Sequence, residues 1–373
     1  MQLTTQQDQA ISRILTWARD PRSPQILRLS GAAGTGKTTI MKQVSDQLTD
    51  RIYWVAPTGR AANRLSLSTG KGATTIHNLI YKAEMIWGEP QFQFIGDTLD
   101  PSFLIVCDEA SMVNGTMGDD LRATGCKILY VGDGFQLPPI GEGSPFLDSP
   151  PDILLTEVHR QALDSPILAY ATQLRGGPRS TVPWTGSLRQ KVGKWKDWEA
   201  DMRWADIIIT GKNQSRERLN DLYRSLRFPQ EFSHEPILPG ETLINLRNNR
   251  AYYPMITNGE LLTVTSSHLS GHRGPWDLVF TRPDYPSLPA ISAPAQLHMD
   301  GKVPNTFSGT SRQTLHTTYG YCVTVHKFQG SQAPRVILYD DGFAYGRATD
   351  RNRWLYTAVT RASSDLLIIR ENN

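Results

Sequence analysis

The stretch Gly31-Ala32-Ala33-Gly34-Thr35-Gly36-Lys37-Thr38 decides how the N-terminal part of this chain folds. Its spacing follows G-x-x-x-x-G-K-[ST], the pattern of a loop whose backbone N–H groups surround nucleotide phosphates. Residues 25–30 before it predict a buried strand, and residues 38–44 after it predict the start of a helix. Because a helix N-terminus favours negative charge, this setting predicts a nucleoside triphosphate site rather than an ordinary glycine-rich turn.

The composition limits the class of protein. A chain of 373 residues is too long for one ordinary core, so two or three domains are expected. Hydrophobic residues make up 39% and charged residues 20%, and no apolar run has the length of a membrane span. The first eight residues lack a basic and then apolar signal region, which predicts a cytoplasmic location without membrane association. The net charge of +3 neither predicts nor excludes a basic groove.

Three widely spaced cysteines, Cys107, Cys126 and Cys322, each lie beside apolar residues. This spacing predicts reduced core residues, and it fits neither a disulfide framework nor a zinc site.

Strands and helices alternate along most of the chain, which predicts parallel sheets with both faces covered. The fold class is therefore α/β, with a first lobe over 1–155 and a second over 156–373. The expected strands are 52–56, 103–107, 127–131, 205–210 and 365–369, and the expected helices are 4–18, 58–68 and 214–226.

Three segments interrupt this alternation. Residues 84–101 predict an inserted hairpin or loop in the first lobe. The segment 176–198 is rich in Gly, Pro, Arg, Lys and Trp, which favours a surface connection. Short strands, prolines and glycines from 236 to 315 indicate a small β-barrel or an irregular insertion in the second lobe, with the barrel itself over about 248–315.

A phosphate loop needs a metal ion and a group that activates water. Asp108 and Glu109 follow the apolar run 103–107, where Asp108 and the Thr38 hydroxyl are expected to hold Mg²⁺. Glu109 is expected to orient or deprotonate the attacking water. The alternative for this pair is a solvated acidic turn.

Three further side chains have chemistry suited to a phosphate. Gln136 follows the run 127–131 and carries an amide that can sense a γ-phosphate, although its surroundings alone would indicate a turn. Arg160 and Arg361 can place fixed positive charge on a migrating phosphoryl group. Taken singly, each arginine is more often a surface charge.

Read in order, these motifs resemble those of superfamily 1 helicases, and within them the RecD-like and phage Dda-like members of group B. The similarity extends over nearly the whole chain. It rests on residues 3–7, 31–39, 56–62, 75–77, 108–111, 132–139, 159–161, 258–260, 324–331 and 359–362. Two positions depart from the family pattern: Gln332 replaces an acidic residue that reaches the nucleotide sugar, and Cys322 stands where alanine is commoner.

The resemblance implies two RecA-like P-loop lobes with ATP in a cleft between them and an SH3-like barrel in the second lobe. The first lobe would supply Lys37, Thr38, Asp108, Glu109 and Gln136, and Arg361 would reach over from the second, with Arg160 near the junction. Gln7 would read adenine. The nucleotide-binding set implied by the family comprises Gln7, Gly34, Gly36, Lys37, Thr38, Thr39 and Gly330.

The resemblance also implies travel along single-stranded DNA in the 5′→3′ direction. Thr58 and His77 of the first lobe, with Thr324 and His326 of the second, would contact the strand. The expected partners are single-stranded and forked duplex DNA, and a single-strand-binding protein or a replisome component is a further candidate. The protein is expected to be monomeric or weakly associating.

Aromatic residues suggest where a duplex could be opened. The family inserts a strand-separating pin where residues 84–101 lie, so Trp87, Phe92 or Phe94 could stack on a base pair at the fork. The alternative is that these rings pack the hairpin onto the lobe.

Other aromatic residues are open to two interpretations. The tryptophans Trp184, Trp195 and Trp198 lie among basic residues, which fits single-strand binding and equally a solvated loop with anchoring tryptophans. For Tyr252, Tyr253, His272 and Trp276, core packing is favoured over a clamp on the strand.

Rival functions stay open at this stage. They are a translocase that strips proteins from single strands, a nucleotide-gated binding module without hydrolysis, and an RNA motor.

Overall fold

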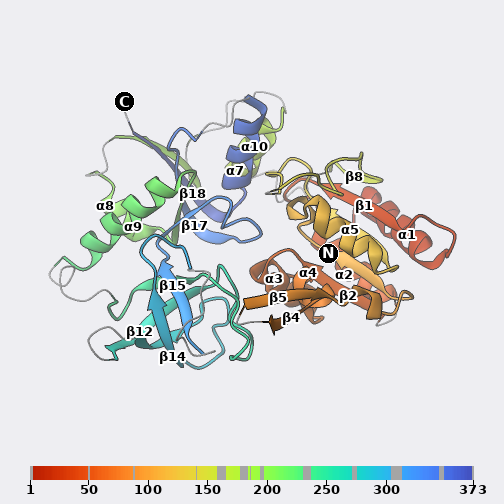
Figure 1. Ribbon diagram of the computed structural model, residues 1–373. Helices are drawn as coiled ribbons and strands as arrows, with labels where there is room; N and C mark the ends of the chain where they lie inside the picture. Colours follow the sequence, from red (N-terminus) through yellow and green to blue (C-terminus); the bar gives the residue numbers. More distant parts are fainter. Residues whose placement is uncertain are drawn as a thin grey trace. The chain divides into compact units, whose positions relative to one another are not determined.

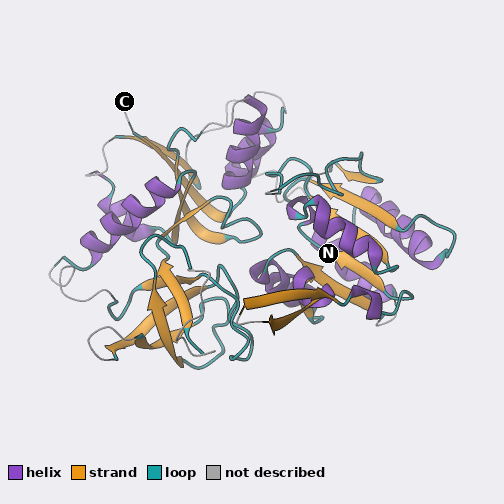
Figure 2. Ribbon diagram, viewed as in Figure 1, coloured by secondary structure: helices purple, strands orange, loops and turns teal. Residues whose placement is uncertain are grey.

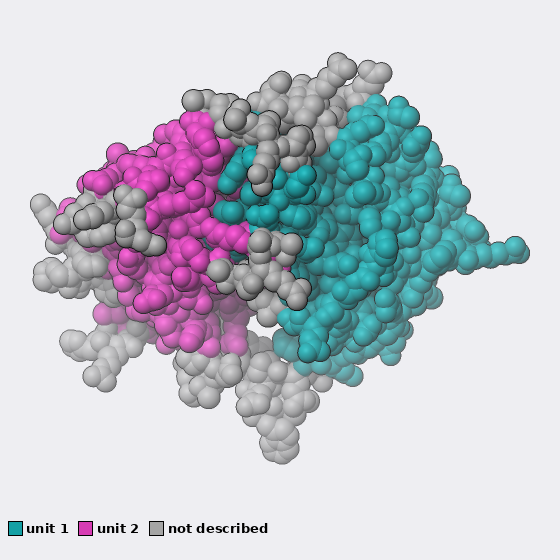
Figure 3. All heavy atoms as spheres, turned by 90° about the horizontal axis from the view of Figure 1, so that it is seen from above, with its two compact units in different colours: residues 1–182, 352–357 teal, residues 183–351, 358–373 magenta. Residues whose placement is uncertain are grey.

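The computed structural model in Figure 1 describes residues 3–48, 51–86, 89–139, 141–157, 165–176, 184, 186–193, 197–229, 237–270, 275–303, 313–343 and 348–371. The chain divides by its contacts into two compact units, coloured separately in Figure 3. Unit 1 comprises Met1–Val182 and Asn352–Thr357, and unit 2 comprises Pro183–Arg351 and Ala358–Asn373. This division does not coincide with the expected lobe boundary at 155/156.

Unit 1 is built on a parallel sheet in which every described neighbour pair runs in the same direction. Apolar residues fill its central strands, because helices cover both faces and leave neither open to water. The strand order is β3 (Ala73–Thr75), β2 (Ile52–Ala56), β6 (Leu104–Cys107), β7 (Lys127–Gly132), β1 (Ile26–Gly31) and β8 (Ile153–Leu155).

Two hydrophobic clusters lie on opposite faces of this sheet, because alternate residues of β6 belong to one or the other. Figure 2 shows helices beside the strands of the sheet. One cluster joins the sheet to α1 (Thr5–Arg19), α2 (Lys37–Gln47) and α3 (Gly59–Thr69). The other joins it to α4 (Ile76–Ile80) and α5 (Gly115–Ala123). Full burial of an Ile or Leu side chain contributes about 1.5–3 kcal/mol, so both layers stabilise the unit.

The inserted hairpin consists of β4 (Tyr81–Ile86) and β5 (Glu89–Phe94), which pair antiparallel. It begins and ends earlier than the expected 84–101, because pairing starts at Tyr81, immediately after α4 ends. A 3₁₀ turn, η1 (Gly96–Thr98), follows the hairpin and leads back to the sheet.

Unit 2 contains a second parallel sheet, flanked by α8 (Glu199–Trp204) and α9 (Asn213–Arg227). The interpretation of 176–198 as a surface connection is wrong for Leu188–Val192, which forms an edge strand of this sheet paired with β18. Only Leu188 of this strand is fully buried, so its other residues carried no hydrophobic signal. The strand order is β16 (Cys322–Thr324), β10 (Ile207–Thr210), β17 (Ala333–Tyr339), β18 (Ala362–Arg370) and β9 (Leu188–Val192).

A closed barrel completes unit 2 and confirms the expected insertion, although it starts and ends outside 248–315. Its core is continuous with that of the sheet. Within it, Arg282 and Glu260 form a buried ion pair, and Arg282 also donates to the carbonyls of Pro254 and Met255. The strands are β11 (Thr242–Asn245), β12 (Leu261–Leu269), β13 (Trp276–Thr281), β14 (Ile291–Leu297) and β15 (Leu315–Tyr319).

Two helices complete the described fold. α7 (Pro166–Leu174) lies in unit 1, and α10 (Ala348–Val359) contributes its segment Asn352–Thr357 to unit 1. No described helix combines the length and hydropathy that crossing a membrane requires. All three cysteines are buried free thiols, which confirms their prediction as reduced core residues.

Candidate active site

The predicted phosphate and metal residues gather at one edge of the unit 1 sheet. The phosphate loop follows β1, Asp133–Gln136 follow β7, and Asp108 with Glu109 follow β6. These three strands are neighbours in the order β6-β7-β1. Because strands lie about 4.8 Å apart, the three groups fall within about 10 Å along this edge. The carboxyl ends of parallel strands are where α/β sheets bind their ligands.

The phosphate loop has the backbone that anion binding needs. Gly34 and Gly36 have φ of 80° and 83°, in the left-handed region that favours glycine. Gly36 caps α2 without any side-chain hydrogen bond. The N–H groups of the first helical turn, which includes exposed Thr38 and half-buried Thr39, therefore lack a capping side chain. This arrangement fits a phosphate group.

Lys37 lies at the centre of the loop. Its Nζ donates to the carbonyl oxygens of Gly31 at 2.8 Å and of Ala32 at 3.0 Å. Both acceptors are backbone carbonyls of the phosphate loop itself. A positive charge held by weak neutral acceptors is ready for exchange onto phosphate oxygens.

The carboxylates after β6 have unusual surroundings. Burial and the charge of Glu109 raise the pKa of Asp108 to about 6. Among described non-glycine residues, Glu109 alone has a left-handed backbone, at φ 51° and ψ 39°. Such a conformation costs energy and is concentrated at functional sites.

Magnesium fits this donor set. The described residues hold no group of three or more His, Cys, Asp or Glu suited to a metal. Mg²⁺ does not need one, because it commonly binds through one or two carboxylates together with phosphates and waters. Asp108 and the hydroxyl of exposed Thr38 supply that kind of partial shell.

Two buried polar atoms near these carboxylates point to a missing partner. Gln136 is buried, and within the described part of the chain its Oε1 has no hydrogen-bond partner. The hydroxyl of fully buried Ser111 is in the same state. A buried polar atom without a partner costs about 1–3 kcal/mol, so a bound ligand or water is the expected occupant.

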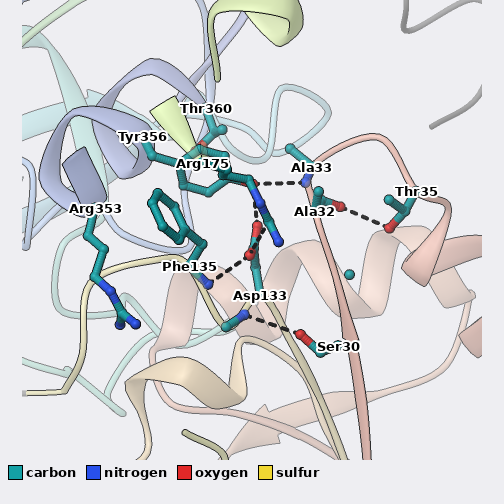
Figure 4. A network of polar contacts seen from close by, with 12 residues as sticks. Ser30, Ala32, Ala33, Thr35, Asp133, Phe135, Arg175, Arg353, Tyr356 and Thr360 are labelled. Carbon is teal, nitrogen blue, oxygen red and sulfur yellow. Dashed lines mark hydrogen bonds and ion pairs between the residues drawn. The ribbon is translucent and has the colours of Figure 1, made fainter. Parts of the chain in front are cut away.

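Asp133 anchors a polar network beside the loop, drawn in Figure 4. Its side chain is 1% exposed and accepts from Arg175 Nη1 at 2.8 Å, from the Tyr356 hydroxyl and from the N–H of Phe135 at 3.0 Å. The Tyr356 hydroxyl in turn accepts from the N–H of Ala33 at 3.1 Å. The network therefore ends on the phosphate loop itself.

Gln7, the expected adenine reader, is buried against the loop. Its Nε2 donates to the Thr35 carbonyl at 3.0 Å, and its Oε1 accepts from the N–H of Thr4 at 3.1 Å. Gln7 thus links the N-terminus of α1 to the phosphate loop.

The predicted residues of unit 2 lie around the turn after β16. Arg361 is 2% exposed and donates to the Ser331 carbonyl at 3.1 Å. Gly330 has φ 76°, and the Thr324 hydroxyl accepts from the N–H of Lys327. His326 meets the Phe343 ring edge-on at 6.3 Å between centroids.

Gln332, which departs from the family pattern, donates to the Thr360 carbonyl at 3.2 Å. The side chain at this position is thus engaged with the segment just before Arg361.

The predicted DNA contacts of unit 1 lie at helix starts and on the hairpin. Thr58 caps α3 and His77 is exposed on α4. Phe92 is 63% exposed, whereas Phe94 is half-buried against Tyr81.

The remaining candidate aromatics divide between core and surface. Trp198 and Trp276 are buried in the core of unit 2, and Tyr252 packs partly against it. Trp184 is partly exposed, and Tyr253 is 96% exposed. Trp87, Arg160, Trp195 and His272 lie outside the described residues.

Two residues of the site carried no separate prediction. Tyr356 belongs to the stretch leading to Arg361, but its role beside the loop had no local signal. Arg175 follows α7 and carried no signal at all, since its partners lie 42 and 181 residues away.

This geometry defines a P-loop nucleotide-binding lobe, and comparison with known proteins identifies its family. Residues 2–188, half of the chain, match the family model of the AAA domain, and residues 319–369 match that of the UvrD-like helicase C-terminal domain. The chain belongs to the superfamily 1 group B helicases, a family of ATP-dependent DNA helicases.

Two relatives show how much of a helicase this chain spans. The ATP-dependent RecD2 DNA helicase of Deinococcus radiodurans is 29% identical over 91% of this chain and 46% of its own length. The ATP-dependent DNA helicase dda of Enterobacteria phage T4 is 29% identical over 91% of this chain and 93% of its own length. The chain thus spans about half of the first relative and nearly all of the second.

A solved structure supports the fold. The Pif1 helicase from Candida albicans aligns with 99% of this chain and 94% of its own, at 16% identity and a TM-score of 0.58. At this identity the likeness shows the fold alone.

Proposed function

We propose that this chain is an ATP-driven motor that moves 5′→3′ on single-stranded DNA and unwinds the duplex ahead of it. One observation carries the proposal. The phosphate loop, the Asp108–Glu109 pair and Gln136 follow three neighbouring strands, and the Gln136 amide oxygen is buried without a partner in the described chain. A site for a triphosphate and its attacking water requires this combination.

In this proposal Lys37 and the N–H groups at the start of α2 bind the phosphates of ATP. Gln7, Gly34, Gly36, Thr38, Thr39 and Gly330 complete the nucleotide-binding set. Thr38 and Asp108 hold Mg²⁺, which when bound neutralises charge that develops on the phosphate oxygens.

Hydrolysis needs a positioned water and fixed positive charge. Glu109 accepts a proton from the water, and the free lone pairs of Gln136 Oε1 orient it. Arg361 and Arg160 supply positive charge to the migrating phosphoryl group, a role worth several orders of magnitude in rate where it has been measured in other enzymes.

The strand of DNA is contacted by Thr58 and His77 in unit 1 and by Thr324 and His326 in unit 2. At the fork, Phe92 is the best-suited ring, because its side chain is exposed on the paired part of the hairpin. Stacking of a base on an aromatic ring is worth roughly 1–3 kcal/mol, which is comparable to the cost of opening one base-pair step.

The proposed DNA substrates are those of proteins that share the fold. A Pif1 helicase from Bacteroides has been solved bound to single-stranded DNA, and another Pif1 structure concerns unwinding at forked duplex DNA. We extend these substrates to this chain, and we add a single-strand-binding or replisome protein as a further candidate partner.

The decisive experiment compares duplexes that carry a 5′ tail with duplexes that carry a 3′ tail, using ATP and Mg²⁺. Unwinding of the 5′-tailed duplex alone is the expected result. Unwinding of only the 3′-tailed duplex would overturn the polarity. DNA-stimulated ATP turnover without unwinding of either duplex would favour a translocase that displaces bound proteins.

A further inference from the structure

The peptide group between Ala32 and Ala33 is held at both ends. Its carbonyl oxygen accepts from Lys37 Nζ at 3.0 Å and from the Thr35 hydroxyl at 2.9 Å. Its N–H donates to the Tyr356 hydroxyl at 3.1 Å. Because a peptide group is planar, a bond that fixes the N–H also fixes the direction of the carbonyl. Tyr356 and Lys37 are therefore coupled through one rigid unit.

Tyr356 is itself firmly held. Its side chain is 1% exposed, and its ring meets Phe135 edge-on at 5.3 Å. The hydroxyl donates to Asp133, whose second oxygen accepts from Arg175 at 2.8 Å. The Arg175 guanidinium also lies over the Phe135 and Tyr356 rings, at 5.5 and 5.4 Å from their centroids. The ion pair, the hydrogen bonds and the ring contacts together restrain the hydroxyl, and Figure 4 shows the polar contacts.

The protonation of Tyr356 suits this role. Burial, followed by the charge of Asp133, raises the pKa of Tyr356 far above its ordinary value. The hydroxyl thus keeps its proton at neutral pH and donates a hydrogen bond to Asp133, and its lone pairs accept from the N–H of Ala33 and from Arg175 Nη1 at 3.3 Å.

We infer that Tyr356 is a positioning residue that sets the phosphate loop and, through the Ala32–Ala33 peptide, the position of the Lys37 ammonium, with Asp133 and Arg175 holding the hydroxyl in place. The inference deepens the proposed function and rests on it for its effect on ATP. The inference also predicts how firmly the phosphate loop is held in the protein without nucleotide. That consequence does not depend on any catalytic activity.

The first test examines the protein without nucleotide. Tyr356→Phe removes only the hydroxyl and keeps the ring against Phe135. Loss of one hydrogen bond corresponds to a factor of about 2 to 10, so hydrogen exchange of the Ala33 amide is expected to accelerate by that factor. The matched control is Tyr53→Phe, also in unit 1, whose ring stacks on Phe103. It is expected to leave exchange in the loop unchanged.

The second test measures phosphate binding well below the melting temperature. Tyr356→Phe is expected to weaken the affinity for Mg·ATP and for pyrophosphate by about 2- to 10-fold, and to leave the affinity for single-stranded DNA without nucleotide unchanged. Arg175→Gln should also lower the affinity for both Mg·ATP and pyrophosphate. Because both changes act through one hydroxyl, the double variant should bind no more weakly than Tyr356→Phe alone.

The outcomes separate the two claims. Unchanged exchange of Ala33 in Tyr356→Phe overturns the positioning role, whatever the wild-type protein does with ATP. A lower melting temperature with unaltered phosphate affinity also overturns it, since that is the behaviour of a purely structural residue. If the wild-type protein neither binds nor hydrolyses ATP, the proposed function fails, and the exchange measurement still decides whether Tyr356 holds the loop.

Discussion

Phe92 and Phe94 lie two residues apart on β5 and so face the same side of the hairpin, but only Phe94 is packed. The Phe94 ring meets Tyr81 edge-on at 6.2 Å and covers Gly96, where a side chain would collide with it. Phe92 is left 63% exposed. Packing of the hairpin therefore accounts for Phe94, and Phe92 is the ring left for the proposed pin.

Phe92→Ala is expected to slow duplex unwinding at least about fivefold and to leave ATP turnover stimulated by single strands unchanged, because only base stacking is lost. Phe94→Ala should instead lower the free energy of unfolding by about 2 kcal/mol. Gln93→Ala, an exposed residue between them, serves as the control. Equal loss of unwinding and ATP turnover in Phe92→Ala would contradict a pin.

Lys37→Ala should reduce ATP turnover by at least about 10²-fold while the fold is retained, since the ammonium placed on the loop carbonyls is lost. Steady-state ATP hydrolysis and circular dichroism check the two parts of this expectation. Lys42→Ala, an exposed lysine on the same helix, should behave as wild type. Turnover retained in Lys37→Ala would remove its phosphate role.

Glu109→Gln should keep nucleotide affinity within about twofold of wild type and reduce hydrolysis by about 10²- to 10⁴-fold, because an amide cannot accept the proton of the attacking water. Binding of a fluorescent ATP analogue and single-turnover hydrolysis measure the two quantities. The exposed Glu142 offers a matched control as Glu142→Gln. Normal single-turnover hydrolysis would show that another group is the base.

Asp340 makes the stability of unit 2 depend on pH. Burial alone would raise the pKa of Asp340, but hydrogen bonds and charge from Arg351 and Arg370 outweigh burial and leave it lowered. A carboxylate with a lowered pKa stabilises the fold above the ordinary aspartate value of about 3.9, and this contribution is lost as the pH falls through the folded-state pKa.

Asp340→Asn should therefore lower the free energy of unfolding by about 1–3 kcal/mol at pH 7, and the difference from wild type should shrink below about pH 4. Urea unfolding at several pH values measures it, with Asp197→Asn, an exposed aspartate of unit 2, as the control. A difference that stays constant down to pH 2 would rule out ionisation as its source.

Apolar periodicity in the sequence predicted the individual strands and helices that have a regular buried face. The strand 52–56 has the expected bounds, and the expected helix 214–226 differs from α9 by one residue at each end. These elements follow from apolar periodicity. β9 was missed because an edge strand with one buried residue has no such pattern. The barrel limits were missed because β11 and β15, which close the barrel, pair with each other from far apart in the sequence.

The candidate site divides in the same way. Lys37, Asp108, Glu109 and Gln136 lie in short motifs that follow strands, so their common edge could be predicted from the alternation of elements. The contact of Tyr356 with Asp133 joins residues 223 positions apart. No sequence window contains such a pair, and only the folded chain reveals it.

The segment Asn352–Thr357 belongs to unit 1 although the chain on both sides of it belongs to unit 2. During synthesis on a ribosome, the Ala33 amide emerges 323 residues before the tyrosine that accepts its hydrogen bond. The Leu137 amide is likewise synthesised long before Thr357, whose hydroxyl accepts its hydrogen bond. A fragment that stops at residue 182 would thus keep the whole sheet of unit 1 and still lack these two acceptors, so nascent or truncated forms should present an unfinished phosphate loop.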